Sequence, residues 1–595
     1  MPSPNNIGDL VTFSVEVNGS PVPDYVQVKS MYVERGINRI PTAKVTVLDG
    51  EASTQTFKAS SSDTFIPGAK IVINAGYDTQ SQAIFKGIIT GQSIRIDDSG
   101  SVLEVECRDE AIKMIVGRKC LTFLQQRDSD VISSIIGKYS LQSDITTTST
   151  IWPEQIQYNV TDWDFILERA EVNGLIVNVV NGKVSVVKPD ADTKPALKVT
   201  YGDNMIGFNA SLNAITQLGS VKATAWDFKK QQTISGQASV SYPGPGNLSS
   251  KTLSGVIGLS DYQIQSTVPF EPVDLNTWSQ SQLVKSNYSK IRGEVTFIGT
   301  SQIDTGKYLT LGGVGDRFNG DHLVSGVVHT IAEGEWITQV TVGLSPVWFV
   351  EELDVLAPRA YGLLTAARGL FNGTVKQMCH DPDSQYRILV NVPLFDPNGA
   401  GIWARLSNFY STSGAGAFFL PEVGDEVVVG FLNEDPRYPI ILGSLYSSST
   451  VKPYTGLDPD QANSIKAIVS KSGIVIQFDD ENKVLTVLTP DKNQVILNDR
   501  DKQITIQDEN QNSIVMSSSG ITMKSPKKIV IQADQGVSIS GTQGITIEAP
   551  AGDVAISGIN IKETADVQYS AQGGETAQID SGMELTLKSA MIMIN

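Results

Sequence analysis

Short runs in which apolar residues stand two apart dominate the last part of the chain, residues 474–594. Glycines such as Gly520, Gly536 and Gly544 separate many of the runs. Alternation of period two predicts strands with one dry face and one wet face. The residues expected on the dry face are Ile474, Ile476, Val495, Leu497, Ile504, Ile506, Ile521, Met523, Ile529, Ile531, Val537, Ile539, Ile545 and Ile547.

A strand of this length has only two or three inward residues, so it cannot bury a core without neighbours above and below it. A single-chain left-handed β-helix needs a strict six-residue repeat, whereas the turns here recur after about eight to eleven residues. A wide single-chain β-helix needs asparagine or aromatic ladders, which are missing. An interlaced trimer around a triangular prism fits best, because closure removes free strand edges along the shaft. An irregular β-sandwich or a β-rich tail remains the alternative.

The region before this needle is also mostly β, with a few helices. Strands are predicted at 11–17, 26–33, 43–48, 70–75, 84–96 and 102–107. A short helix is predicted at 109–116, a second at 130–139 with Ser129 as its N-cap, and a third after Thr161 that ends at Asn173 and Gly174. Residues 239–254 are expected to form a loop and 275–289 a helix.

Residues 370–446 contain five further strand patterns, at 371–379, 386–392, 402–406, 426–432 and 440–446. Five strands over this length are typical of a small closed barrel of the OB type. The stretch from Gly414 to Pro436, which reads GAGAFFLPEVGDEVVVGFLNEDP, is distinctive. The residues that mark the barrel are Trp403, Pro421, Gly424, Asp425, Gly430 and Gly443.

This block resembles the OB domain of VgrG-type spike proteins and phage baseplate spikes. The resemblance extends upstream to residues 36–50 and 158–174, which are similar to the tail-hub region of that family, and to residues 318–329, which are similar to its second barrel. It implies a tail-hub domain with a first barrel and helical insert at 1–190, and a second barrel with its connector at 191–368. An OB-fold domain at 369–446, a linker at 447–463 and a trimeric β-helix needle at 464–595 would follow.

Composition and charge exclude several classes of function. The chain has 595 residues and a formal charge of −18, which argues against a nucleic-acid partner and against electrostatic binding to an anionic membrane. Three scattered cysteines, Cys107, Cys120 and Cys379, fit neither a disulfide framework nor a zinc site and indicate folding in the cytoplasm. We also expect no secretory signal and no membrane-spanning helix.

No catalytic constellation is recognisable, so an enzyme is not expected, and no cofactor or metal is expected either. The three histidines, His322, His329 and His380, lack ligand spacing and are interpreted as structural residues. Carboxylate clusters such as Asp479, Asp480 and Glu481 fall in predicted turns, where solvated turn residues are the ordinary interpretation, with weak cation binding as an alternative. The tail after residue 446 leaves no room for the lysozyme domain that some phage spikes carry.

The resemblance implies a mechanical function, that of the central spike of a contractile injection machine. A homotrimer would link the inner tube and baseplate to a needle that contacts the target membrane only mechanically. Such a spike would assemble in the bacterial cytoplasm and become part of an injection particle, and it could carry cargo effectors. The sequence does not tell an extracellular system from a type VI secretion apparatus or a phage. Leu585, Leu587, Met591 and Met593 are candidates for docking a PAAR-like tip protein. A trimeric fibre or adhesin and a spike-associated cell-wall hydrolase are the alternatives.

Overall fold

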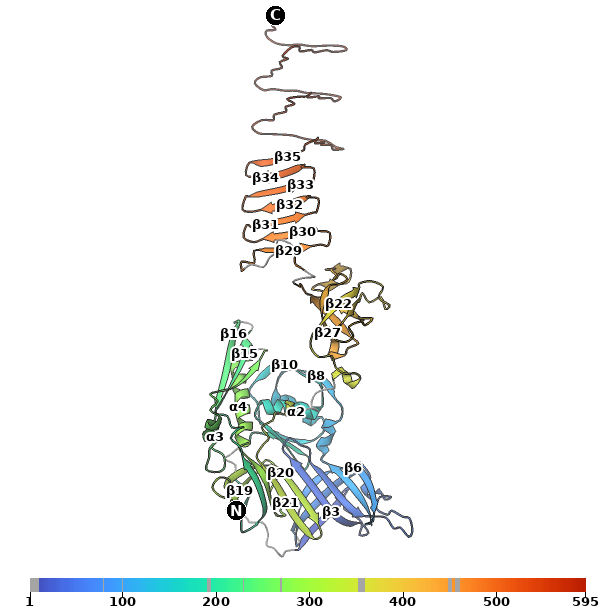
Figure 1. Ribbon diagram of the computed structural model, residues 1–595, viewed down its shortest axis with the longest axis vertical. Coiled ribbons are helices and arrows are strands. Elements are labelled where there is room, and N and C mark those ends of the chain that lie inside the picture. The colour runs from blue at the N-terminus through green and yellow to red at the C-terminus, as the bar shows by residue number, and fades with distance from the viewer. Residues whose placement is uncertain are drawn as a thin grey trace. The chain divides into compact units, whose positions relative to one another are not determined.

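A computed structural model describes residues 10–78, 80–98, 100–189, 194–227, 230–267, 270–351, 359–447, 452–454 and 461–594. The chain forms two compact units that divide between Ser444 and Leu445. Strands are the main regular element of both units (Figure 1), which confirms the mainly β fold class. The boundaries of the smaller domains stay predictions, and the linker predicted at 447–463 lies largely outside the described residues.

The first unit begins with an antiparallel sheet whose strands follow the predicted alternation. Met31, Val45 and Val105 stand opposite one another on three adjacent strands, and all three side chains are buried. Such cross-strand apolar contacts fix the register, because a slip of one residue would turn each side chain toward water. The strands are β1 (Val11–Val17), β2 (Ser20–Pro21), β3 (Gln27–Gly36), β4 (Thr42–Leu48), β5 (Lys70–Tyr77), β6 (Gln80–Asp97) and β7 (Gly100–Arg108).

A second group of strands continues the same sheet. Strand β20 pairs with β3, so that His329 stands opposite Val33, and the combined sheet has 13 strands. The segments predicted as separate first and second barrels are therefore joined edge to edge by backbone hydrogen bonds. The strands of this group are β13 (Leu197–Thr200), β14 (Met205–Leu212), β18 (Ile291–Ile298), β19 (Tyr308–Gly312), β20 (Gly320–Ala332) and β21 (Glu335–Val342).

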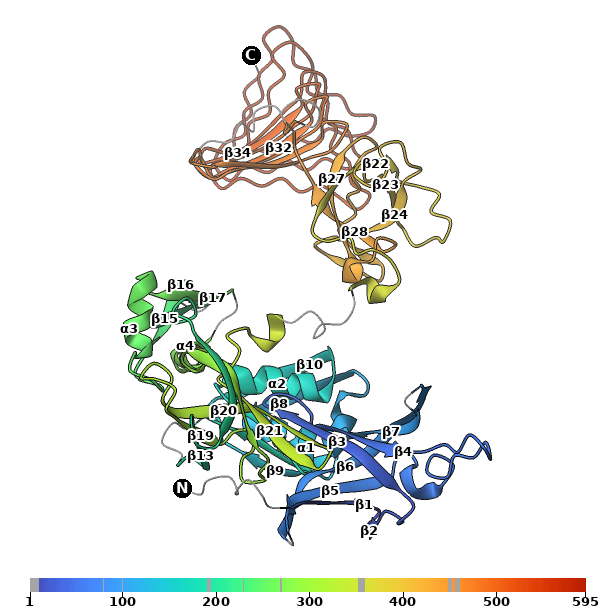
Figure 2. The same ribbon diagram turned by 60° about the horizontal axis from the view of Figure 1, so that its bottom comes forward.

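Between these groups lie two helices and two small sheets with a core of their own. Helix α2 (Asp162–Val172) begins as predicted, since the Thr161 hydroxyl accepts a hydrogen bond from the Asp164 N–H at 3.0 Å, and Asn173 caps its end. A two-stranded sheet pairs β8 with β10, which runs beside α2 (Figure 2). The strands are β8 (Lys119–Arg127), β9 (Gln142–Ile145), β10 (Ile151–Val160), β11 (Ile176–Val180) and β12 (Lys183–Val187).

The predicted start of the helix at residues 130–139 is wrong. Helix α1 (Asp128–Gly137) begins two residues earlier, with Arg127 as the N-cap. The Ser129 N–H donates instead to the Thr148 hydroxyl at 3.2 Å, and the Asp128 carboxylate is held by other side chains. Tertiary hydrogen bonds therefore override the local capping preference. The short helix predicted at 109–116 is confirmed as a 3₁₀ turn over Glu110–Ile115.

A third small sheet, β15 (Ser220–Asp227), β16 (Gln232–Ser239) and β17 (Tyr262–Ser266), packs against helix α4 (Pro272–Tyr288), which confirms the helix predicted there. The loop predicted at 239–254 is wrong in its last part, because helix α3 (Ser250–Ile257) begins there. The Ser249 hydroxyl caps it by accepting from the Thr252 N–H at 3.0 Å. The proline- and glycine-rich stretch ends before this cap.

Residues 371–444 form the predicted closed barrel. Its strands are β22 (Phe371–Gln377), β23 (Ile388–Asn391), β24 (Ile402–Leu406), β27 (Glu426–Phe431) and β28 (Pro439–Ser444), in the order β22-β23-β24-β28-β27. Val375, Val390, Ala404, Val429 and Ile441 fill the interior. A small hairpin of β25 (Ser411–Thr412) and β26 (Ala415–Gly416) precedes β27.

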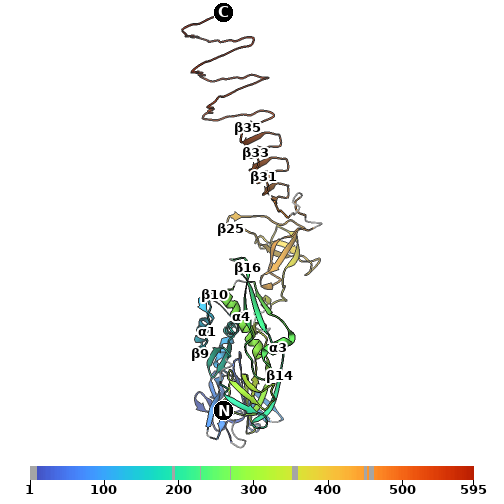
Figure 3. The same cartoon turned by 90° about the vertical axis from the view of Figure 1, so that its left-hand side faces the viewer.

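The second unit opens with a seven-stranded antiparallel sheet in which each strand pairs with the next along the chain. Figure 3 shows β31, β33 and β35 one above the other. The prediction of interlaced chains does not hold here, because these strands find their partners within one chain. They are β29 (Ile465–Val469), β30 (Val475–Asp479), β31 (Val484–Leu488), β32 (Gln494–Asn498), β33 (Gln503–Gln507), β34 (Ser513–Ser517) and β35 (Gly520–Lys524).

The described residues after Lys524 contain no strand. The runs from Ile529 to Met593, which the alternation predicts as strands, rise instead in open turns that lie apart from one another (Figure 1). A strand exists only where a second strand hydrogen-bonds to it, and this segment meets none in its own chain.

The turn before β27 offers a test of the barrel. Gly424 has a φ of +96°, which a β-branched residue adopts only with strain, although no atom lies within 4 Å of an added Cβ. We expect Gly424→Val to lower the free energy of unfolding by about 1–3 kcal/mol. Gly443→Val on β28 is the control, since its Cβ would also meet open space and its φ is not positive. Urea unfolding should show a loss only for Gly424→Val, and equal losses would contradict this explanation.

Candidate functional site

Two parallel columns of apolar side chains run along one face of the sheet β29–β35. In the first column each residue stands directly opposite the next on the neighbouring strand: Ile468, Ile476, Val487, Val495, Ile506, Ile514 and Met523. The second column has the same arrangement: Phe478, Leu485, Leu497, Ile504, Met516 and Ile521. Nearly every position of this face from β30 to β35 is therefore apolar.

This apolar face is exposed. Ile504 is 38% exposed and Ile506 is 43% exposed, whereas Gln503, Thr505 and Gln507, which alternate with them, are less exposed. The opposite face is largely polar. There Gln494 Nε2 donates a hydrogen bond to Gln507 Oε1 on the neighbouring strand at 3.3 Å. The usual preference of apolar groups for the interior is reversed, so the sheet presents a face that lacks a covering layer.

The predicted dry-face residues thus fall into two groups. From β30 to β35, Ile476, Val495, Leu497, Ile504, Ile506, Ile521 and Met523 share the apolar face, and Ile474 lies just before β30 and is 45% exposed. The others, Ile529, Ile531, Val537, Ile539, Ile545 and Ile547, lie beyond β35 and are each more than half exposed. Phe478, Val487 and Ile514 belong to the same face but were not among the predicted residues. The alternation that identified the others would have found them.

A groove connects the two groups. It has a volume of about 580 Å³ and runs along the first column from Val487 past Ile506 to Met523 and Ile529. The groove therefore extends beyond β35 to Ile529, with Lys524, Ser525 and Lys528 lining it between the two apolar stretches. The candidate tip residues extend the same pattern, since Leu585, Leu587, Met591 and Met593 are 53%, 62%, 72% and 80% exposed.

The OB signature residues shape the barrel. Pro421 is buried, and the Asp425 carboxylate accepts from the Glu422 N–H at 2.8 Å, which closes the turn around Gly424. Trp403 lies on β24, Gly430 on β27 and Gly443 on β28. These positions support their interpretation as fold markers and assign them no chemistry.

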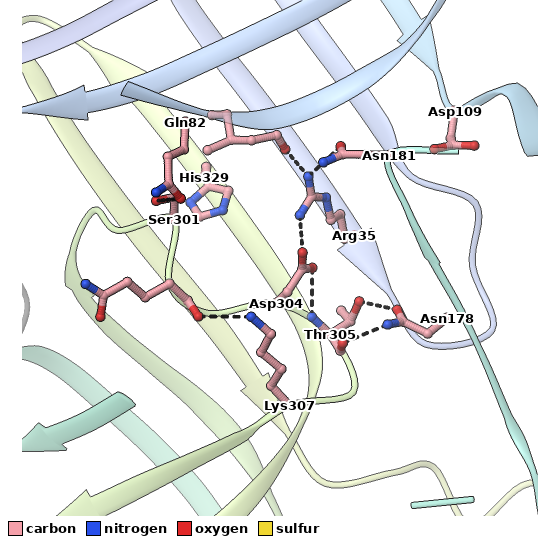
Figure 4. Close-up of polar contacts among 12 residues, drawn as sticks. Arg35, Gln82, Asp109, Asn178, Asn181, Ser301, Asp304, Thr305, Lys307 and His329 are labelled. Atoms are coloured by element: carbon pink, nitrogen blue, oxygen red, sulfur yellow. Dashed lines mark hydrogen bonds and ion pairs between the residues drawn. The ribbon is translucent and has the colours of Figure 1, made fainter. Parts of the chain in front are cut away.

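A buried polar cluster holds the first unit together around Arg35, which is 4% exposed. Its guanidinium donates to Asp304 at 2.5 Å, to Asn181 at 3.1 Å and to the carbonyl oxygen of Ile84 (Figure 4). Arg35 comes from β3, Asn181 from the β11–β12 turn and Asp304 from the segment between β18 and β19. The cluster therefore fastens three parts of the unit at one point, and a buried ion pair of this kind is costly to break.

His322 and His329, both buried on β20, serve the fold. His329 Nδ1 lies 2.9 Å from the Thr338 hydroxyl, and His322 Nε2 lies 2.7 Å from the Phe318 carbonyl oxygen. Burial lowers the pKa of His322 to about 4 and that of His329 to about 3, with the charge of Arg35 acting in the same direction on His329. His380 is exposed in a turn.

The remaining candidate chemistry is sparse. The three cysteines are free, and burial raises the pKa of the Cys107 thiol to about 12. Within the described part of the chain, no group of three histidine, cysteine or acidic side chains is placed to hold a metal ion. No helix of the described residues is long and apolar enough to cross a membrane.

Two family matches cover most of the first unit. Residues 7–333 match the family described as the Alg8 N-terminal domain. Residues 371–446 match the type VI secretion system/phage-baseplate injector OB domain. The second match begins and ends within two residues of the closed barrel β22–β28.

Curated relatives match over short stretches. The actin cross-linking toxin VgrG1 of Vibrio cholerae is 43% identical over 53 residues, which are 9% of this chain and 5% of that protein. The type VI secretion system spike protein VgrG4b of Pseudomonas aeruginosa is 30% identical over 132 residues, 21% of this chain and 16% of that protein. The chain thus spans only a small part of the length of these relatives. The matches confirm the resemblance to VgrG-type spike proteins.

Solved structures with a similar arrangement are more distant in sequence. A 43 kDa tail protein of prophage MuSo2 from Shewanella oneidensis has a TM-score of 0.43 and 12% identity, and it covers 56% of this chain and 98% of its own. An E. coli component of the type VI secretion system has a TM-score of 0.39 and 12% identity, covering 72% of this chain and 99% of its own.

The two buried histidines predict a pH dependence of stability. Their folded-state pKa values lie below the ordinary value of 6.5, so the unfolded chain binds more protons as the pH falls below that value. Their contribution to the free energy of unfolding is fully present above about pH 6.5 and is lost as the pH falls toward 4 for His322 and 3 for His329. The free energy of unfolding then falls with a limiting slope of about 1.4 kcal/mol per pH unit for each histidine.

His322→Gln retains an N–H donor for the Phe318 carbonyl oxygen but cannot titrate, so it should reduce this slope. Urea midpoints of the first unit between about pH 7 and pH 5 measure the effect. His380→Gln, in the exposed turn, is the matched control and should leave the slope unchanged. A slope that His322→Gln does not alter would contradict the assignment.

Proposed function

The chain belongs to the family of the Alg8 N-terminal domain, and from that premise we propose that three copies of it form the central spike of a contractile injection machine. The observation that carries this proposal is the uncovered apolar face of β29–β35 together with its continuation after Lys524. Both features leave one chain incomplete by itself.

Three copies of the sheet would cover one another's apolar faces. If each sheet forms one side of a triangular prism, the two columns from each chain point to a common axis and the polar faces point outward. Burying the rest of a half-exposed isoleucine contributes on the order of 1 kcal/mol. Every strand from β30 to β35 contributes two apolar residues of the face per chain. The free energy gained by their burial therefore grows with the number of strands in the needle.

The segment after Lys524 would complete the needle by a different arrangement. Its apolar pairs, such as Ile529 with Ile531 and Val537 with Ile539, recur about eight residues apart. An extended backbone without partners in its own chain gains them when two other copies run between its turns. Each backbone hydrogen bond formed in this way adds about 0.5–1.5 kcal/mol. Three interwoven chains separate only when all these ladders break, so the needle would be kinetically stable under force.

The other parts would then have mechanical tasks. The large sheet of the first unit would seat on the inner tube and baseplate, and the OB barrel would connect it to the needle. The exposed pairs Leu585 with Leu587 and Met591 with Met593 would dock a PAAR-like tip protein. The spike would assemble in the cytoplasm, become part of an injection particle and touch the target membrane only mechanically.

An enzymatic function has little support. The relative named as an actin cross-linking toxin matches over 53 residues, 5% of its length, so its name does not carry over to this chain. A passive fibre or adhesin would also use a trimeric needle, but it would not require residues 7–333, which match a family of their own.

Two neighbouring residues on β33 test the trimer. Ile506→Asp would place a charge at the axis of the prism, where it has no partner, and we expect it to prevent assembly. Thr505→Asp on the opposite face is the matched control. Both variants introduce aspartate, so they share its low strand propensity and its negative charge and differ only in the face that receives it. Light scattering should find a trimer for the native chain and for Thr505→Asp, and a monomer for Ile506→Asp. A native monomer would refute the proposal.

Removing residues 585–595 tests the tip. The shortened chain should remain a trimer that resists SDS at room temperature, since residues 465–584 keep their contacts, but a co-expressed PAAR-like protein should no longer co-purify with it. Leu585→Ser together with Leu587→Ser should have the same effect without shortening the chain. Tip binding that survives in both variants would place the docking surface elsewhere.

A further inference from the structure

A pocket of about 570 Å³ opens in the first unit between β10, α2 and α4. These elements lie together in Figure 2, and the pocket lies within residues 152–351. Its walls are mostly apolar, and Trp152 and Phe270 meet edge to face at 5.9 Å. The apolar and aromatic residues of the wall are Trp152, Ile156, Phe165, Phe270, Trp278 and Trp348.

One residue of the pocket wall, Gln155, has a side-chain hydrogen-bond acceptor that is closed off from solvent. Gln155 is 9% exposed, and its Nε2 donates to Asp128 at 2.7 Å. That bond fixes the orientation of the amide, since only the nitrogen can face a carboxylate. Gln155 Oε1 is therefore held on the other side, where it is buried and accepts no hydrogen bond from any described residue. A buried acceptor without a partner costs about 1–3 kcal/mol.

The cations around the pocket are already engaged. Arg169 donates to Asp128 at 2.6 Å and lies over the Trp152 ring, and Lys285 is paired with Glu171 and lies over the Trp348 ring. These two pairs are neutral as units. Asp128 also accepts from Trp152, Gln155 and Asn173, so it has no capacity left for a ligand.

Three other carboxylates of the pocket wall have no ion-pair partner among the described residues. Among the described residues, no lysine or arginine nitrogen lies within 4.0 Å of Glu154, Glu168 or Glu351. Burial raises the pKa of Glu168, which shows that its charge is poorly solvated, although the neighbouring Arg169 acts in the opposite direction. The pocket therefore combines aromatic walls with an excess of negative charge.

We infer that this pocket binds a basic side chain, a guanidinium or ammonium group on an apolar stem, presented by a partner protein other than this chain. The cation would face Glu168, and its stem would pack against Trp278 and Phe270. Aromatic faces and carboxylates together favour cations over neutral groups of the same shape. The chain itself carries a formal charge of −18, so a basic partner is drawn to it.

Alternative occupants fit less well. An anion would meet three carboxylates, and a purely apolar group would leave Glu168 without a partner. The pocket lies wholly within the first unit, so its binding chemistry does not depend on how the C-terminal sheet assembles.

A pair of isosteric tripeptides tests the inference on the full-length protein. Ac-Leu-Arg-Leu-NH₂ carries the guanidinium, and the same peptide with citrulline replaces it by a neutral urea of nearly the same shape. Calorimetry should show at least about ten-fold tighter binding of the arginine peptide, with an affinity that falls as salt is raised. Equal binding of both peptides, or binding of neither, would overturn the inference.

Variants locate the binding to this pocket. Glu168→Gln removes the charge and keeps the shape, and it should reduce the preference for arginine to within about two-fold. Glu154→Gln, at an exposed position, should weaken binding less and leaves folding intact. Glu335→Gln, exposed at the start of β21 and away from the pocket, is the control and should bind like the native protein. Unchanged preference in both Glu168→Gln and Glu154→Gln would also overturn the inference.

Discussion

An extended strand can keep its backbone out of water only when neighbouring strands accept its hydrogen bonds, and it can bury alternate side chains only when a second layer covers them. The C-terminal unit meets the first requirement only from β29 to β35, and one chain does not cover the apolar face of these strands. Every functional inference about this unit follows from that deficit. The proposed trimer would remove this deficit, because each copy would cover the apolar face of the others.

The two parts of the unit solve the deficit in different ways. In β29–β35 each strand pairs with its sequence neighbour, so the register is set locally and the sheet can form before any other copy arrives. After Lys524 the described residues form no strand, so in the proposed trimer they would obtain their backbone hydrogen bonds from other copies. Three preformed sheets that meet through their apolar columns would hold three such segments in register at their start. The local sheet thus provides a template for the part that cannot fold alone.

The sequence predicted the barrel, most strands of the large sheet and the apolar face, because these depend on alternation and turn chemistry that are visible locally. Val45 and Val105 alternate with polar residues on their strands, and Gly424 marks its turn by residue type. The start of α1 was wrong because the partners of Asp128 and Ser129 come from residues 148, 155 and 169. The local pairing of β29–β35 was missed because both an interlaced and a meandering needle show the same alternation. The unused acceptor of Gln155 has no local signal at all, since it follows from where Asp128 lies.

The two units draw their stability from different interactions. The first unit is fastened by buried polar groups such as Arg35 with Asp304 and by neutral, buried histidines, which specify one arrangement of its three parts. The second unit contains no comparable cluster among its described residues and relies on a repeated apolar face. A repeated apolar face adds stability with each strand and has no single weakest contact. The polar cluster around Arg35, by contrast, fixes the arrangement of three parts of the first unit at one point.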